Sequence, residues 1–457
     1  MSRLFRLGAI PSFLMLCIFL GGSTRGHWAN MVLQLLAIAI IAWAALIRRP
    51  AHMPKPGYML LLLTGLMLVV ILLQLVPLPP PVWTSLPGRD FIANGYALLG
   101  QPLPWLPVSM APYQTISSAL WLLPPLAVIA GILRLGAFRP SWLAGGLAIA
   151  TFAAVLVGTL QVSSGNPTSS LWYFYKFSNF GMATGFFANS NHMATLLVVT
   201  IPFLVALFGF RQSKAKSAQI SASKSAVLGG GLLVILLGLG LNGSLAGMGL
   251  GVPVVAASAL LGASLQRNWA RWSLAGVVLV GAASVALIFS SPLQNDLTGA
   301  GAGQSSQSRY TMFKTSLAAA ADFAPGGSGL GTFADIYPRY EDAASVDRTY
   351  VNHVHSDFIE LFLETGIPGL VLIALFLFWW GRRVVAIWRS PNIDHYARAA
   401  TIASAAILAH SVVDYPLRTA AISAVFAMCL ALMVQPRRGT LVEPARGDQK
   451  GRHLSVG

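Results

Sequence analysis

Residues 57–77 read GYMLLLLTGLMLVVILLQLVP and contain no charged residue. An apolar run of this length can cross the hydrocarbon core of a bilayer as one α-helix, for which roughly 17–25 residues are needed. A lipid-exposed backbone has to satisfy its own hydrogen bonds, so such runs predict helices. Comparable runs lie near residues 9–21, 30–47, 117–133, 142–163, 188–209, 226–243, 246–265, 272–290, 358–380, 397–413 and 419–435. The pattern predicts an all-α polytopic membrane protein with about twelve transmembrane helices.

The composition agrees with a membrane protein. Of the 457 residues, 55% are hydrophobic and 10% are charged, whereas about a quarter are charged in an ordinary soluble domain. These values exclude a disordered chain and a disulfide scaffold, and they leave little room for a water-soluble enzyme. The two cysteines, Cys17 and Cys429, lie in the first and last apolar runs, where a thiol behaves as a small apolar side chain. Neither a disulfide framework nor a metal site can be built from them. We also expect no cofactor.

The charged residues predict the orientation. The net charge is +16, from 30 Lys and Arg against 14 Asp and Glu. With the N-terminus inside, most of the cations fall on the cytoplasmic side, as the positive-inside rule requires. This predicts a single transmembrane domain over residues 1–435 and a basic tail over 436–457, with both termini cytoplasmic. The basic excess is then a topology signal, and we expect no nucleic-acid partner. The first run also resembles a cleaved signal peptide, but we favour an uncleaved anchor because the later runs already hold the chain in the membrane.

Two long loops are predicted on the outer, periplasmic side. The loop at about 78–116 is rich in Pro and Trp, which suggests a lid on the membrane surface. The loop at about 291–357 joins spans nine and ten, and loops of such length are usually functional. In it we expect an amphipathic helix over residues 305–317, then a glycine-rich turn over 325–333 whose backbone N–H groups can face an anion. Residues 337–350 alternate aromatic and charged side chains, which suits either sugar binding or an ordinary solvated loop.

The segment NHVHSDFIE, residues 352–360, contains the strongest candidates for chemistry. Ser356 or Asp357 can cap the helix that enters the membrane there, and carboxylates in its first turns favour the helix in any case. An imidazole at this boundary, from His353 or His355, can take a proton from a hydroxyl near neutral pH. A purely structural role for these histidines remains the alternative.

Three further polar clusters are expected at outer helix ends. One opens the sixth span, one links the seventh and eighth spans, and one ends the eleventh. Ionisable groups at membrane depth are functional candidates by default. We therefore predict one extracytoplasmic site above the bundle, open laterally to lipid. Its supporting residues would be His353, Asp357, Glu364, Asn189, Asn191, His192, His410 and Asp414.

These residues resemble the O-antigen ligase and polymerase family of bacterial inner-membrane proteins, which also includes related protein O-glycosyltransferases. The resemblance covers residues 180–435. Its strongest element runs from Arg309 through the glycines to His355-Ser356-Asp357, Glu364 and Gly366. The stretches 185–192 and 410–414 support it.

The resemblance implies a multi-pass inner-membrane transferase that moves a glycan from undecaprenyl diphosphate to an acceptor hydroxyl, such as that of lipid A-core, on the periplasmic face. It implies no nucleotide sugar and no metal. His355 would deprotonate the acceptor, and Arg309 would bind the diphosphate and stabilise the leaving group. Family members commonly carry Ser-Arg after the seventh span, but this chain has Leu245 at the arginine position. Candidates for a second cation are Arg418, Arg339, Arg348 and Lys176.

Two other functions fit parts of the sequence. An O-antigen or exopolysaccharide polymerase would differ only in its acceptor, and nothing in the sequence separates it from a ligase. A transporter or flippase would also have twelve spans. The chain shows no internal repeat, however, and its polar residues gather on one face instead of at the midplane, which favours the transferase with membrane lipid and lipid-linked glycan as partners.

Overall fold

The computed structural model describes residues 3–23, 28–47, 53–209, 218–261, 309–343, 346 and 351–434. The predicted ninth span, the basic tail and Arg348 lie outside these ranges. Within them, the first half of the chain forms α1 (Arg3–Leu20), α2 (Trp28–Leu46), α3 (Lys55–Leu73), α6 (Pro112–Leu120), α7 (Leu123–Leu133), α8 (Pro140–Val162) and α9 (Ser190–Phe208). The second half forms α10 (Ala218–Asn242), α11 (Leu245–Ala259), α14 (Arg309–Asp322), α15 (Phe333–Ile336), α16 (Asp357–Trp388), α17 (His395–His410) and α18 (Ala420–Val434).

The structure confirms an all-α polytopic membrane protein. Among the described residues, seven helical segments are long and apolar enough to cross a membrane, and three more apolar helices are shorter. One of the seven, residues 112–133, consists of α6 and α7 with a break at Trp121–Leu122, just before Pro124 and Pro125 at the start of α7. The total of twelve spans and the length of the loop between spans nine and ten stay predictions.

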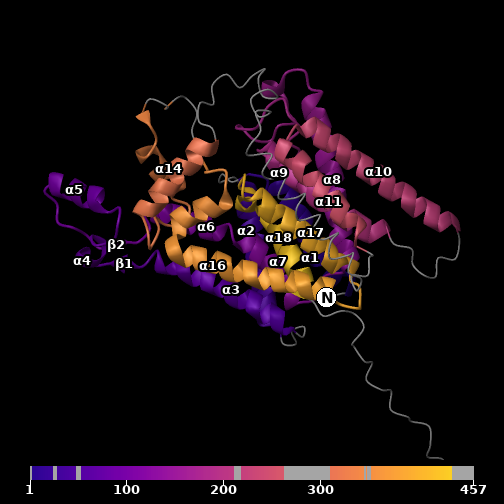
Figure 1. The fold of residues 1–457 in the computed structure, drawn as a ribbon, viewed down its shortest axis with the longest axis horizontal. Helices are drawn as coiled ribbons and strands as arrows, with labels where there is room; N and C mark the ends of the chain where they lie inside the picture. Colours follow the sequence, from indigo (N-terminus) through magenta and orange to yellow (C-terminus); the bar gives the residue numbers. More distant parts are fainter. Residues whose placement is uncertain are drawn as a thin grey trace, which may run out of the picture.

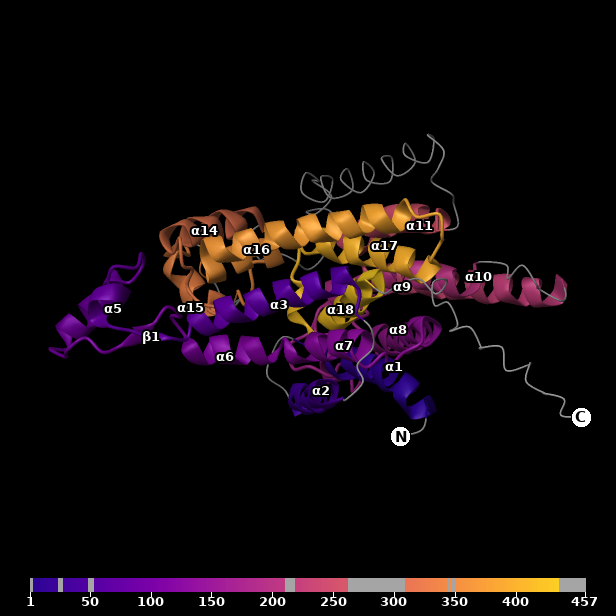
Figure 2. The same ribbon diagram turned by 90° about the horizontal axis from the view of Figure 1, so that it is seen from below.

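The centre of the bundle is built on α18 and α9. Every residue of α18 is buried except Ser423 and Phe426. The many alanines of α18 let α7, α17 and α1 approach closely, as small residues do in membrane bundles. Figures 1 and 2 show α18 enclosed by these helices, with α3 and α16 side by side along one flank.

The first outer loop is not purely helical, which the all-α prediction missed. Strand β1 (Pro77–Leu78) pairs antiparallel with β2 (Leu106–Pro107), and between them lie the short helices α4 (Pro80–Trp83) and α5 (Asp90–Leu98). Trp83 is buried, and its indole N–H donates to the Pro104 carbonyl at 2.8 Å. The strand pair thus closes the loop at its base, and α5 projects beyond the end of the bundle (Figure 2).

The glycine-rich turn contacts the first outer loop and α16, and the N–H groups of Ser328, Gly329 and Leu330 do not face an anion as predicted. The N–H groups of Ser328 and Gly329 donate to the carbonyls of Leu363 and Glu364 at 3.0 and 2.9 Å. Leu330 N–H donates to the side-chain oxygen of Gln74 at 3.0 Å, and the Gln74 amide donates to the Glu364 carbonyl at 2.8 Å. Because these donors are already used inside the protein, the turn has a structural role.

A break in α16 allows this contact. Gly366 has φ 61° and ψ −148°, so the helix changes direction after its polar first turns. A Cβ at this position would overlap the Pro325 carbonyl oxygen. Only glycine combines this backbone conformation with so close an approach.

Candidate active site

The polar clusters predicted at separate helix ends meet at one end of the bundle. Helices α9, α11 and α16 begin there, and α10 and α17 end there. The Asn191 amide donates to Asp414 Oδ2, and the Asn242 amide donates to the Ser190 carbonyl at 2.8 Å. Asp357 N–H donates to the Ser411 carbonyl at 3.0 Å. The structure therefore brings together the clusters that the sequence placed on one side of the membrane.

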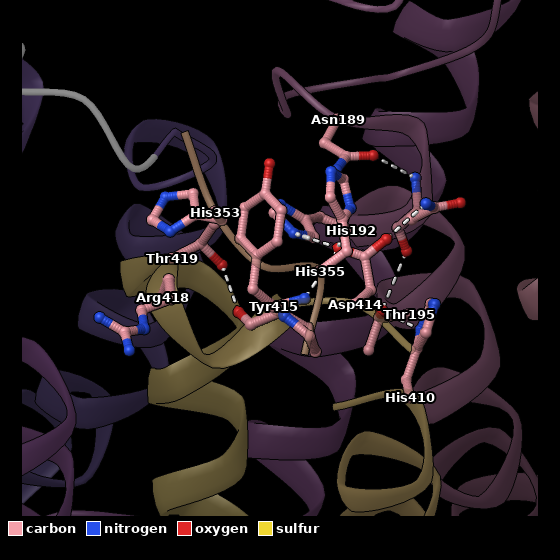
Figure 3. Close-up of polar contacts among 12 residues, drawn as sticks. Asn189, His192, Thr195, His353, His355, His410, Asp414, Tyr415, Arg418 and Thr419 are labelled. Carbon is pink, nitrogen blue, oxygen red and sulfur yellow. Dashed lines mark hydrogen bonds and ion pairs between the residues drawn. The ribbon is translucent and has the colours of Figure 1, made fainter. Parts of the chain in front are cut away.

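Asp414 is the centre of this cluster. Its carboxylate is fully buried, and its Oδ1 atom lies 3.6 Å from His192 Nε2 and 3.7 Å from His355 Nδ1. Figure 3 shows both imidazoles beside the carboxylate. Burial alone would raise the pKa of Asp414, but the imidazoles of His192 and His355 hold it well below its usual value. Asp414 is thus an anion that two histidines share.

His355 has a strained backbone conformation. Its φ is 60°, and it is the one non-glycine residue with positive φ in the part of the chain that the structure describes. L-residues avoid this region, and such strain is often found at functional sites. The conformation turns Nδ1 toward Asp414, while 26% of the side chain stays exposed. The carboxylate favours a proton on Nδ1, which leaves Nε2 with a free lone pair.

Sequence reasoning missed Tyr415, the residue after Asp414. Its ring centroid lies 4.2 Å from that of His353, 4.9 Å from that of His192 and 5.0 Å from that of His355. Burial raises the pKa of its hydroxyl, which therefore stays protonated. The sequence signal that could have indicated Tyr415 was only its position next to Asp414 in a polar cluster. In the fold this ring packs against all three imidazoles.

Arg418 does not face Asp414. It ends the 3₁₀ turn η4 (Pro416–Arg418), and its guanidinium contacts Glu364 at 2.7 Å, Glu360 at 3.4 Å and Asp357 at 3.8 Å, all on the first turns of α16. Although burial opposes its charge, these carboxylates raise its pKa. A cation that already neutralises several carboxylates is poorly suited to a diphosphate. The geometry therefore favours a structural role for Arg418.

His353 is tied to the same group of carboxylates. Its Nδ1 lies 2.8 Å from Glu360 Oε1, and the backbone N–H of Val354 donates to Glu360 Oε2 at 2.9 Å. Glu360 thus contacts both Arg418 and His353. These contacts separate the two histidines of the 352–360 segment, because His353 faces α16 whereas His355 faces Asp414.

His410 contacts Thr195 in the same cluster, and Arg309 lies close enough to interact with His410. His410 is buried, and its Nδ1 lies 2.7 Å from the Thr195 hydroxyl, which itself donates to the Asn191 carbonyl at 2.9 Å. Arg309, the first residue of α14, interacts electrostatically with His410. In the described residues no ion pair joins Arg309 to a carboxylate. Arg309 is thus a cation near the cluster that no described carboxylate neutralises.

The remaining predicted cations lie elsewhere. Arg339 stacks on Phe91 of the first outer loop, with 3.5 Å between the guanidinium carbon and the ring centroid. Lys176 is exposed on the connection between α8 and α9. Leu245, where the family resemblance led us to expect arginine, begins α11 directly after Ser244, whose hydroxyl donates to the Asn191 amide oxygen at 2.7 Å. Among the described residues, no three His, Cys, Asp or Glu side chains are grouped to hold a metal ion.

Comparison with known protein families gives a match over part of the chain. Residues 230–374 match the family model described as O-antigen ligase. The matched stretch contains Arg309, His355 and all three carboxylates that hold Arg418. No curated protein matches the chain. The family match supports a glycosyl-transferring enzyme of the O-antigen ligase or polymerase type, with lipid-linked glycan and acceptor as partners. The chain is therefore a multi-pass membrane protein that is similar to the O-antigen ligase family over residues 230–374.

Proposed function

We propose that this protein is an O-antigen ligase that transfers a glycan from undecaprenyl diphosphate to an acceptor hydroxyl of lipid A-core on the periplasmic face of the inner membrane. The observation that carries the proposal is the position of His355 beside the buried carboxylate of Asp414, with Arg309 near the same cluster. The reaction needs a base for the acceptor and a cation for the leaving group, and these residues are suited to both tasks.

His355 acts as the general base. Asp414 holds the proton on Nδ1, so Nε2 accepts the proton of the acceptor hydroxyl. The acceptor oxygen then attacks the anomeric carbon, and the bond from this carbon to the diphosphate oxygen breaks. The separation of 3.7 Å between Nδ1 and Asp414 Oδ1 is longer than a hydrogen bond, and such contacts commonly tighten only when substrate is bound.

Arg309 stabilises the departing diphosphate. Negative charge grows on the leaving oxygen as the glycosidic bond breaks, and a guanidinium can bind two phosphate oxygens at once. Diphosphate is a good leaving group, so it needs a cation more than it needs a strong acid. The proposal uses no metal and no nucleotide sugar, and it assigns Asn191 and His192 to the positioning of Asp414.

Deletion and complementation test the proposal. Cells that lack the gene should accumulate lipid-linked glycan and display unmodified lipid A-core on a gel of surface polysaccharide. Complementation with His355→Gln or Arg309→Gln should fail. Matched controls are His395→Gln, a histidine at the other end of α17 from His410, and Lys314→Gln, an exposed cation on α14; both should restore ligation. Full complementation by the first pair would refute the mechanism, and decoration with single repeat units would indicate a polymerase.

A further inference from the structure

A pocket lies where the two outer loops meet. It has a volume of about 330 Å³ and is lined by Gly88, Asp90, Phe91, Phe323, Arg339 and Tyr340. Its first three residues come from the first outer loop and the others from the second. Ligand pockets typically range from roughly 300 to 1,000 Å³, so this one suits a small ring system.

Helix α14 connects this pocket to the proposed active site. Arg309 begins the helix near His410, and Phe323 follows its last residue, Asp322. A helix of 14 residues is about 20 Å long. The pocket is therefore too distant to contact the reacting atoms, and its ligand has to be a separate molecule or a distant part of a long substrate.

The pocket is held in shape by contacts beneath it. The Arg89 guanidinium lies 5.5 Å from the Phe323 ring centroid, and its Nη2 donates to the Gly327 carbonyl at 3.4 Å. Gly88 has φ 72°, and a Cβ there would lie 2.7 Å from the Phe323 ring. On the opposite wall, the Tyr340 hydroxyl interacts with the Asp322 carboxylate. The aromatic walls therefore exist before a ligand binds.

The side chains in the pocket suit a sugar ring. The apolar C–H face of a pyranose packs against aromatic rings such as Phe323 and Tyr340, because their π faces are electron-rich. Sugar hydroxyls can donate to the Asp90 carboxylate and accept from the Arg339 guanidinium, whose plane is already fixed by Phe91 at 3.5 Å. A free phosphate would be repelled by Asp90, and an acyl chain would leave both charges without partners.

We infer that this pocket is a glycan-binding subsite. It holds a sugar residue that lies several sugar units away from the new glycosidic bond. The biological role of this subsite rests on the proposed function, the transfer of a glycan. The sugar can belong to the donor glycan or to the acceptor oligosaccharide, because both carry the same kind of rings. In either case the subsite orients a long substrate along α14, toward Arg309 and the histidine cluster.

Binding of lipid-free sugars tests this inference without the transfer reaction. The full chain in phospholipid nanodiscs would be examined by saturation-transfer difference NMR. The two probes are the core oligosaccharide and the repeat-unit oligosaccharide, released by mild acid from the surface polysaccharide of the bacterium that carries the gene. We expect one probe to bind the wild type and the His355→Gln variant equally, and which probe binds identifies the source of the sugar.

Variants locate the binding. Arg339→Gln, which removes the donor, and Phe91→Leu, which removes the ring that orients it, should each weaken binding roughly tenfold, equivalent to about 1.4 kcal/mol. Arg139→Gln, which removes an unrelated arginine–tryptophan stack, should leave it unchanged. Absence of binding for both probes, or equal binding by wild type and both pocket variants, would overturn the subsite. If binding behaves as expected but the gene deletion leaves ligation intact, only the proposed function fails.

Discussion

The imidazole of His355 lies 3.7 Å from the buried carboxylate of Asp414, although the two residues belong to separate polar motifs at the ends of different helices. The same carboxylate is 3.6 Å from His192. The carboxylate of Asp414, which follows α17, is thus the centre of the site. The start of α9 and the start of α16 each place a histidine beside it. The proposed chemistry depends on that anion staying charged.

Replacement of His355 by alanine and by glycine separates catalysis from backbone strain. Both changes remove the proposed base, so each should lower the transfer rate by roughly 10²–10⁴-fold. Glycine tolerates positive φ, whereas alanine does not, so His355→Gly should be about 1–2 kcal/mol more stable than His355→Ala. In vitro transfer and thermal unfolding in detergent measure the two effects. Equal stability of the two variants would contradict the strain at φ 60°.

The Asp414→Asn variant tests the charge on the central carboxylate. The folded protein holds the pKa of Asp414 well below its usual value, which is about 3.9 in an unfolded chain. A depressed pKa stabilises the fold above that unfolded value, and the contribution is lost as the pH falls toward the folded pKa. The variant should therefore unfold at a lower temperature than the wild type at pH 7. The difference should narrow only below about pH 4, and narrowing between about pH 7 and 5 would argue against a depressed pKa.

Arg418 and Arg309 should respond differently to substitution. Arg418→Met leaves the carboxylates of α16 without their cation, and breaking a buried ion pair costs roughly 3–5 kcal/mol. Loss of thermal stability and of folded yield should follow. Arg309→Gln should abolish transfer with little change in the unfolding temperature, because no described carboxylate pairs with it. A stable, inactive Arg418→Met protein would instead place Arg418 in substrate binding.

Leu245→Arg tests whether the diphosphate lies beside Asn191. The new guanidinium would begin α11, next to the Ser244 hydroxyl that contacts Asn191 at 2.7 Å. A charge-assisted hydrogen bond contributes about 1.5–3 kcal/mol, so the KM for the lipid-linked donor should fall roughly tenfold with kcat little changed. Leu245→Met is the control for size. Steady-state kinetics in which the two variants match would place the diphosphate elsewhere.

Much of the fold could be predicted from local sequence. The apolar runs predicted the helices that are long and apolar enough to cross a membrane, and the helix Arg309–Asp322 overlaps the predicted amphipathic segment. The strand pair at Pro77 and Leu106 was missed because two residues per strand give no periodic pattern. The acceptors of the glycine-rich turn could not be predicted, because partners of its N–H groups such as Gln74 lie far away in the sequence.

By itself, the sequence determined that this protein lies in a membrane and that its polar residues gather at helix ends, because hydropathy and helix capping act over a few residues. Only the tertiary structure decided which polar residues become partners. His355 and His192 both contact Asp414. Arg418 instead pairs with the carboxylates of α16. Ion pairing depends on distances between helix ends, and these are set by how the whole bundle packs.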